Sequence, residues 1–226
     1  MPRSVNGFGT GLCRASRRRV VSGGEHYDAI EAVTAVWCPL IPYRVIHVIA
    51  QTYDWRRPGE STYRFIPLRF SWSTICRASF HAWGGFLSIL GIGGTILFSI
   101  ASFNMEREFT STDAAFIAAF AAAGMIGVLL RIVSWVLSRR SERIKDLLGP
   151  HECGFSDPFE WADEIANDVL TRLQMTEAEL LERAYHLAEH APAEAGWYLR
   201  LNQRIRNTPA ADNLLETLLS ARTWHQ

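Results

Sequence analysis

Two long apolar stretches, residues 80–101 and 114–137, dominate the pattern of hydrophobic and polar positions along the chain. No Asp, Glu, Lys or Arg occurs from Ala78 to Met105. A helix of about 20 apolar residues is long enough to cross the hydrocarbon core of a bilayer, which is about 30 Å thick. The pattern therefore predicts two transmembrane helices joined by a short external link, residues 102–113.

Small side chains recur four residues apart within both stretches. In the membrane, helices approach closely where such small residues align. These rows of small residues can pack the two helices against each other. Alternatively, they can form a helix face that binds another subunit. The residues concerned are Gly84, Ser88, Gly91, Thr95 and Ser99 in the first stretch, and Ala115, Ala119, Ala123 and Gly127 in the second.

Arg131 is the only Asp, Glu, Lys or Arg inside either stretch. A charge within the membrane is a functional hypothesis by default. Arg131 also lies one turn from Trp135 and two turns from Arg139, so its guanidinium can reach the headgroups by extending along the helix. We expect this extended arrangement, with pairing to a partner's carboxylate as the alternative.

In residues 26–78, runs of β-branched and aromatic residues are broken by Pro and Gly, which is a pattern typical of β-strands. The pattern predicts strands at 29–37, 44–53 and 62–72, with a turn at 56–60. Pro39 and Pro42 interrupt the pattern between the first two, since proline cannot donate to a strand ladder. We expect a small antiparallel β module at the membrane surface, where Trp and Tyr concentrate.

Residues 138–226 are predicted to form a cytoplasmic helical module. The charged run after Ser138 continues the second membrane helix until Gly149 and Pro150 end it. Four amphipathic patterns follow, and their start signals are Ser156 or Asp157 with Pro158, a capping box at Thr176 and Glu179, Pro192, and Thr208 with Pro209. The whole chain is therefore expected to be an α+β membrane protein with a two-helix hairpin between a β module and a helical module.

Charge is distributed unevenly along the chain. Residues 1–79 carry eleven Arg and five acids, whereas residues 138–226 carry ten basic and fifteen acidic side chains. Because Arg and Lys flank both stretches on the sides away from the link, the positive-inside rule places both termini in the cytoplasm. Lys145 is the single lysine in the chain, which is typical of a GC-rich bacterial genome, so we expect the bacterial inner membrane.

Residues 1–25 are rich in Gly, Ser and Arg and lack apolar periodicity, so we expect a disordered basic leader. Its run of Arg17, Arg18 and Arg19 can attract anionic headgroups, or it can simply be solvated. A start codon placed too far upstream would also explain the segment. The four cysteines are far apart, so free thiols are expected.

The most suggestive candidate for chemistry is the H-x-x-E-H pattern of His186, Glu189 and His190. A zinc site needs a third ligand, for which Glu194 and Glu216 are the candidates. The pattern lies in the last turn before Pro192, a poor platform for a rigid site, and cationic histidines are favourable at a helix end without a metal. A zinc hydrolase is therefore the weaker alternative.

Other constellations are less specific. His26, Asp28 and His47 can act as acid and base groups on the sheet, although such residues on a strand are usually solvated. His151, Cys153 and His190 can meet in space, but no spacing requires it. The glycines of residues 7–11 and 91–94 lack the context of a phosphate-binding loop. We assign no catalytic, cofactor-binding or metal-binding residue.

These observations favour a non-enzymatic two-pass inner-membrane protein that presents cytoplasmic interaction modules as a scaffold or adaptor. Its expected partners are the bilayer, with its anionic headgroups, and an unknown protein, bound through the helical module or the small-residue faces. No cofactor and no nucleic acid are expected. The alternative function is an accessory or assembly subunit of a larger membrane transport or envelope complex.

Overall fold

A computed structural model describes residues 4–5, 8–21, 24–53, 61–104, 110–151 and 154–223 of the 226-residue chain. The chain divides into two compact units, each built from three separate segments. We call residues 1–15, 29–43 and 72–138 the first unit, and residues 16–28, 44–71 and 139–226 the second unit.

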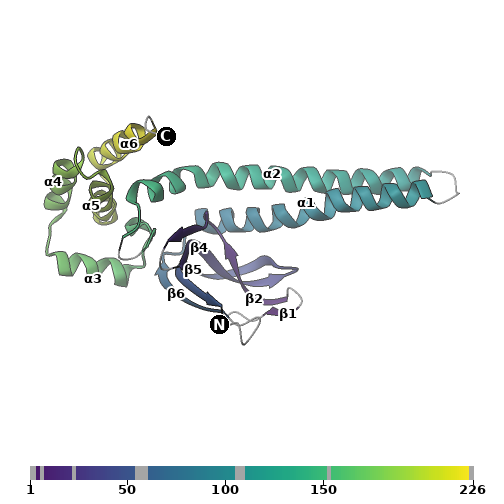
Figure 1. Ribbon diagram of the computed structural model, residues 1–226, viewed down its shortest axis with the longest axis horizontal. Helices are drawn as coiled ribbons and strands as arrows, with labels where there is room; N and C mark the ends of the chain where they lie inside the picture. The colour runs from purple at the N-terminus through teal and green to yellow at the C-terminus, as the bar shows by residue number, and fades with distance from the viewer. Residues whose placement is uncertain are drawn as a thin grey trace. The chain divides into compact units, whose positions relative to one another are not determined.

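The N-terminal region forms an antiparallel sheet (Figure 1). The strand order is β1-β2-β4-β5-β6, and β3 pairs with the N-terminal end of β4. The strands are β1 (Ser4–Val5), β2 (Phe8–Arg14), β3 (Arg19–Val21), β4 (Gly24–Ala35), β5 (Cys38–Tyr53) and β6 (Ser61–Leu68).

The sheet is larger than the three strands that the sequence predicts. β2 and β3 lie within residues 1–25, the segment for which disorder was expected, because β4 supplies partners such as Ala32 for Gly11. β5 runs through both prolines because the pairing of β6 with β5 begins only at Val45, opposite Leu68. Proline is tolerated where one side of a strand has no ladder to complete. The predicted turn at residues 56–60 lies outside the described residues.

Two long apolar helices, α1 (Trp72–Asn104) and α2 (Ser111–Leu148), pack side by side in the first unit (Figure 1). Gly91 of α1 lies against the backbone of Gly124, and Gly84 lies against Gly127 and the stem of Arg131. Gly84, Ser88 and Gly91 of the row expected in α1 therefore lie at the contact between the two helices. In α2, Gly127 of the predicted row contacts α1, whereas Ala115 and Ala119 are exposed and Gly124, which was not predicted, faces α1.

Both helices are long and apolar enough to cross a membrane. Only 17% and 11% of the residues in their most apolar windows are buried inside the protein, so neither helix is an ordinary core helix. Part of the predicted external link, residues 105–109, lies outside the described residues.

The last ten residues of α2 belong to the second unit. The helix ends at Leu148, and the N–H of Gly149 donates to the carbonyl of Lys145 at 3.1 Å. Gly149 has φ +65°, which is a conformation that glycine adopts without strain. The predicted helix end at Gly149 is confirmed.

A short 3₁₀ helix and four α-helices complete the second unit: η1 (Pro158–Glu160), α3 (Asp163–Leu173), α4 (Glu177–Leu187), α5 (Pro192–Ile205) and α6 (Pro209–Thr223). The capping box at Thr176 and Glu179 is confirmed. The first predicted helix is split after Glu160, because Trp161 bridges Leu68 and the N–H of Ala162 donates to the carbonyl of Pro67 at 3.1 Å. These residues therefore extend the sheet instead of the helix.

The apolar core of the second unit joins the end of α2 to the C-terminal helices. Leu147 is completely buried among side chains of α4, α5 and α6, and Gly196 allows α5 to approach it closely. The other buried members include Ile144, Leu148, Ala184, Leu199, Leu215 and Leu219. The C-terminal helices and the end of α2 thus share one core.

Candidate functional site

The second unit contains a buried charge cluster, which we define as Asp28, His47, Lys145 and Glu160. Asp28 comes from β4, His47 from β5, Lys145 from the end of α2 and Glu160 from η1. The side chains of Asp28, His47 and Lys145 are at most 1% exposed. Four segments that are distant in sequence therefore meet at one set of charges.

Asp28 is the centre of this cluster. One carboxylate oxygen lies 2.7 Å from Nδ1 of His47, and the other forms an ion pair with Nζ of Lys145. Lys145 also lies 3.6 Å from a carboxylate oxygen of Glu160. The backbone N–H of Asp28 donates to Oγ of Ser16 at 2.6 Å, which fixes the strand beside it. Because a carboxylate only accepts hydrogen bonds, Nδ1 of His47 carries the proton in this pair.

Burial shifts the protonation of the two basic members. It lowers the pKa of His47 to about 4, and the charge of Glu160 opposes this shift only in part. It also lowers the pKa of Lys145, against the opposing charges of Glu160 and Asp157. His47 is therefore neutral near pH 7.

Arg19 of β3 forms a second set of ion pairs at the end of α2. Its Nη2 lies 2.7 Å from a carboxylate oxygen of Glu142 and 2.8 Å from one of Asp146. The backbone N–H of Arg17 donates to Glu142 at 2.8 Å. Of the arginine run for which lipid attraction or free solvation was considered, Arg19 instead binds α2, and Arg18 pairs with Glu25.

Arg200 of α5 organises the turn that carries η1. Its guanidinium binds both carboxylate oxygens of Asp157, with its closest contact at 2.6 Å, and it donates to Gln203 at 2.6 Å. Asp157 also caps η1 by accepting from the N–H of Phe159 at 3.0 Å. A bidentate arginine pair of this kind fixes orientation as well as distance.

The buried charge cluster has the residue types of an acid–base site but lacks access. The expectation of solvated strand residues is wrong for His26, Asp28 and His47, all of which are buried. The rings of His26 and His47 are 6.0 Å apart, and Gly154 packs directly against His26. A substrate cannot reach Asp28 or His47 without opening the unit, so the arrangement supports a structural role.

The H-x-x-E-H residues do not share a helix face. α4 ends at Leu187, and the N–H of His190 closes a tight turn on the carbonyl of Leu187 at 3.2 Å. The His186 side chain is 75% exposed and lies 3.7 Å from Glu182. Glu216, one candidate third ligand, pairs with Arg140 at 2.9 Å.

Among the described residues, no group of three or more His, Cys, Asp or Glu side chains is placed to hold a metal ion. His151 is held at Nε2 by the carbonyl of Ser156 at 2.8 Å. Cys153, considered with it as a candidate, lies outside the described residues, as does Gly7 of the N-terminal glycine pattern.

A concave site, which we call the aromatic pocket, opens beside the core of the second unit. Its volume is about 490 Å³, within the range of small-ligand sites. Trp161, Trp197 and Tyr198 line it together with His151, and the Trp197 ring lies 5.3 Å from that of Tyr198 and 6.4 Å from that of Trp161. Sequence periodicity places Trp197 in a helix core but does not reveal this concave arrangement.

Two charged residues also line the aromatic pocket. Arg172 forms an ion pair with Asp168 on its own helix, so its charge is partly balanced. Glu194 is exposed in the first turn of α5. Residues 150–226 carry thirteen acids and six arginines, so the surroundings are acidic.

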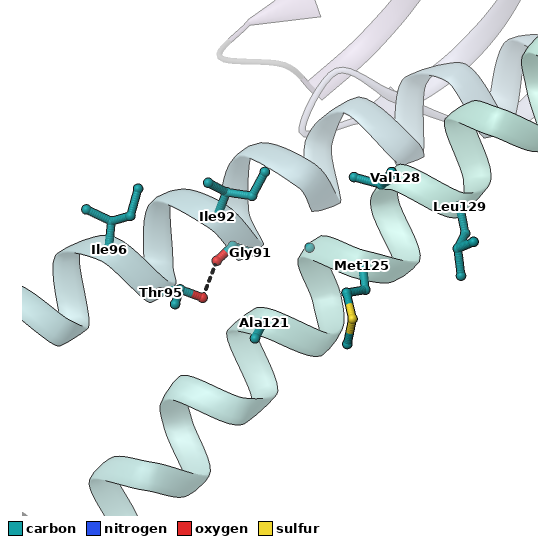
Figure 2. Close-up of a pocket in the computed structure, with 9 residues that line it drawn as sticks. Gly91, Ile92, Thr95, Ile96, Ala121, Met125, Val128 and Leu129 are labelled. Atoms are coloured by element: carbon teal, nitrogen blue, oxygen red, sulfur yellow. Dashed lines mark hydrogen bonds between the residues drawn. The ribbon is translucent and has the colours of Figure 1, made fainter.

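An apolar groove of about 560 Å³ lies between α1 and α2 in the first unit (Figure 2). Figure 2 shows Ile92 and Ile96 on one helix and Met125, Val128 and Leu129 on the other. The hydroxyl of Thr95 donates to the carbonyl of Gly91 at 2.7 Å, so its donor is already used. The groove therefore suits an apolar occupant such as an acyl chain.

Comparison of the chain with protein-family models, curated proteins and solved structures gave no match in any of the three.

Sequence reasoning did not find the residues that organise the second unit: Lys145, Arg19 and Arg200. Each occurs in a polar or amphipathic segment that is typical of a solvated surface. The one available signal is that Lys145 is the only lysine, and it lies between the later-buried Ile144 and Leu147.

Proposed function

We propose that this chain is a two-pass inner-membrane protein that presents an acidic interaction module to the cytoplasm, as a non-enzymatic scaffold or adaptor. The observation that carries the proposal is the exposed apolar surface of α1 and α2. The buried charge cluster supports it by connecting the strands, the end of α2 and η1 within the second unit.

The surface of the paired helices suits lipid. Ile89 is 77% exposed and Leu97 is 70% exposed, and other large apolar residues are exposed along both helices. Contiguous apolar surface of this extent is rare on soluble monomers. α1 from Gly84 to Asn104 rises about 31 Å at 1.5 Å per residue, which equals the thickness of a hydrocarbon core.

Flanking charges support the orientation. Arg69 and Arg77 precede the first apolar stretch, and Arg139, Arg140 and Arg143 follow the second. Basic residues near membrane helices favour the cytoplasmic side, where anionic headgroups also attract them. Both termini would then face the cytoplasm.

The aromatic pocket supports the adaptor function. Its rings suit an apolar or cationic side chain, and Glu194 with the acidic surroundings favours a positive partner. We expect the partner to be a protein segment in which Arg or Lys lies next to an apolar residue.

Membrane insertion and orientation can be tested with single cysteines in a background without the native ones. Ser111 and Ser220 are both exposed and lie on the two predicted sides of the membrane. In intact cells, an impermeant maleimide should label the Ser111→Cys chain and not the Ser220→Cys chain. Release of the chain from membranes by alkaline carbonate would contradict insertion, and the reverse labelling would contradict the orientation.

Binding can be tested with the full chain in nanodiscs of uncharged lipid. A fluorescent Arg-Leu peptide should bind, and Glu194→Lys should weaken binding about tenfold, which corresponds to 1.4 kcal/mol. Glu189→Lys is the matched control, since Glu189 is exposed but does not line the pocket. Equal effects of the two substitutions would remove the pocket from the proposal.

The second candidate is an accessory subunit of a larger membrane complex. It is favoured by the exposed small side chains of Ala115, Ala119 and Ala122 on α2, a surface that another helix can approach closely. Arg131 would pair with a carboxylate of that partner. Ala119→Leu should then abolish assembly without preventing insertion, and unchanged assembly would count against this candidate.

A further inference from the structure

The hairpin between β4 and β5 exposes apolar side chains at its end. We call residues 33–43 the hairpin tip. Trp37 is 67% exposed and Ile41 is 63% exposed, and Val33, Leu40 and Tyr43 are also exposed. Such a patch is a liability on a sheet in water, because exposed apolar strands aggregate.

The sequence of the hairpin tip is unusually apolar for a turn. No Asp, Glu, Lys or Arg occurs from Ala32 to Tyr43. The register that pairs Gly9 with Thr34 also places exposed Phe8 beside this end of the sheet. The patch therefore extends over two neighbouring strands.

The turn itself is strained. Val36 and Trp37 have φ values of +52° and +61°, although glycine and asparagine are the residues that such two-residue turns favour. A β-branched residue in this conformation is a marked outlier. Strain of this kind persists where the surroundings require it and is frequent at binding surfaces.

The hairpin tip is attached to α1 within the first unit. Nε1 of Trp83 donates to the carbonyl of Pro39 at 3.2 Å. The tip is therefore level with the turn of α1 that holds Trp83, where the apolar surface of the helix begins. On α2, the stem of Arg131 packs against Gly84, next to Trp83.

Trp83 and Arg131 are residue types that mark the boundary between headgroups and acyl chains. Beyond Gly84, α1 has the length of one hydrocarbon core. If α1 crosses the membrane as proposed, a patch at the level of Trp83 would lie at the depth of the membrane interface.

We propose that the hairpin tip inserts into the interface of the same bilayer that α1 and α2 cross. Leu40 and Ile41 would contact the upper acyl chains, and Trp37 and Tyr43 would lie among the headgroups. The inference rests on the proposed membrane function, and it adds a third membrane contact from a strand hairpin.

The experiment uses the full chain in nanodiscs, with single cysteines carrying an environment-sensitive fluorophore. Leu40→Cys and Ile41→Cys are tested separately. If one variant fails to fold, the other still tests the inference. Leu97→Cys on α1 is the lipid control, and Asn167→Cys on α3 is the water control; both positions are exposed. Lipids with a doxyl group near the headgroup quench a fluorophore that contacts the membrane. Iodide in solution quenches a fluorophore that is exposed to water.

The doxyl lipid should quench the labels at positions 40 and 41, and iodide should quench only the label at position 167. Quenching by iodide at positions 40 and 41, with position 97 protected, would overturn the inference and leave the membrane function intact. Quenching by iodide at position 97 as well would overturn the proposed function.

Discussion

At the scale of single residues, Lys145 has the largest expected effect on stability. Removing one partner of a buried ion pair costs about 3–5 kcal/mol, because the other charge remains buried. Lys145→Met should therefore destabilise the folded chain by about 3 kcal/mol. Thermal unfolding in detergent measures the change, and Arg183→Met, at an exposed position, is the control with an expected change below about 0.5 kcal/mol.

Because His47 is buried, it makes the folding stability of the chain depend on pH. In the unfolded chain the imidazole takes up a proton below pH 6.5, whereas in the folded chain burial lowers its pKa to about 4. Between these values the unfolded state binds more protons, so stability falls as the pH decreases from 6.5 to 4. The shift corresponds to a loss on the order of 3 kcal/mol.

His47→Asn keeps a donor near the position of Nδ1 and removes the titration. Unfolding midpoints of both chains, measured at intervals from pH 7.5 to 4, should converge in acid. A variant that keeps the full slope of the original chain would show that another group is responsible.

The burial of these residues could not be read from the sequence. His26, Asp28 and His47 lie in strands whose alternation allows either face to be solvated. They are buried because the end of α2 and η1 meet the sheet, and such long-range pairing leaves no local pattern.

At the scale of elements, the contact between α1 and α2 depends on Gly91. A Cβ atom at this position would collide with the backbone of Gly124, so Gly91→Ala should force the helices apart and destabilise them by about 1–3 kcal/mol. Gly93→Ala is a matched control, because an added Cβ there meets no described atom within 4 Å. Alanine at position 93 should be neutral or stabilise the helix by up to about 1 kcal/mol.

Resistance to dissociation in SDS, followed through the helical circular dichroism signal, measures this difference. Equal behaviour of the two alanine variants would show that the close approach at Gly91 contributes little.

Helices with local sequence signals, such as caps, were predicted well. Strands that form through pairing with distant segments were not. Thr176 and Glu179 satisfy each other within one turn, so the capping box was visible in the sequence. The Gly-rich strand β2 has a weak local signal and depends on its pairing with β1 and β4.

At the scale of the whole molecule, the second unit combines β3, β6 and parts of β4 and β5 with the end of α2 and the C-terminal helices. Truncation after Gly149 removes Glu160 from the buried charge cluster and Ala162 from its hydrogen bond with Pro67. The backbone amides of the remaining strands should therefore be less protected from hydrogen exchange. Amide hydrogen exchange at residues 44–48 should increase in the truncated chain, and unchanged exchange would favour separate β and helical modules.

The division of the chain by sequence pattern, with a β module at 26–78 and a helical module at 138–226, stays a prediction, and the sequence pattern alone does not reveal the contacts within the second unit. The sequence pattern identifies the type of each segment, whereas the ion pairs of Asp28, Arg19 and Arg200 join segments that are distant in the sequence. These pairs join positions more than forty residues apart, beyond the reach of any periodicity.

The burial of the only lysine has a practical consequence for chemical labelling. Apart from the amino terminus, the folded chain exposes no primary amine, because Nζ of Lys145 is enclosed beside Asp28. An acylating reagent can therefore reach Lys145 only when the second unit opens. The rate of acylation at this one atom, followed by mass spectrometry, reports how often the unit opens without any engineered probe.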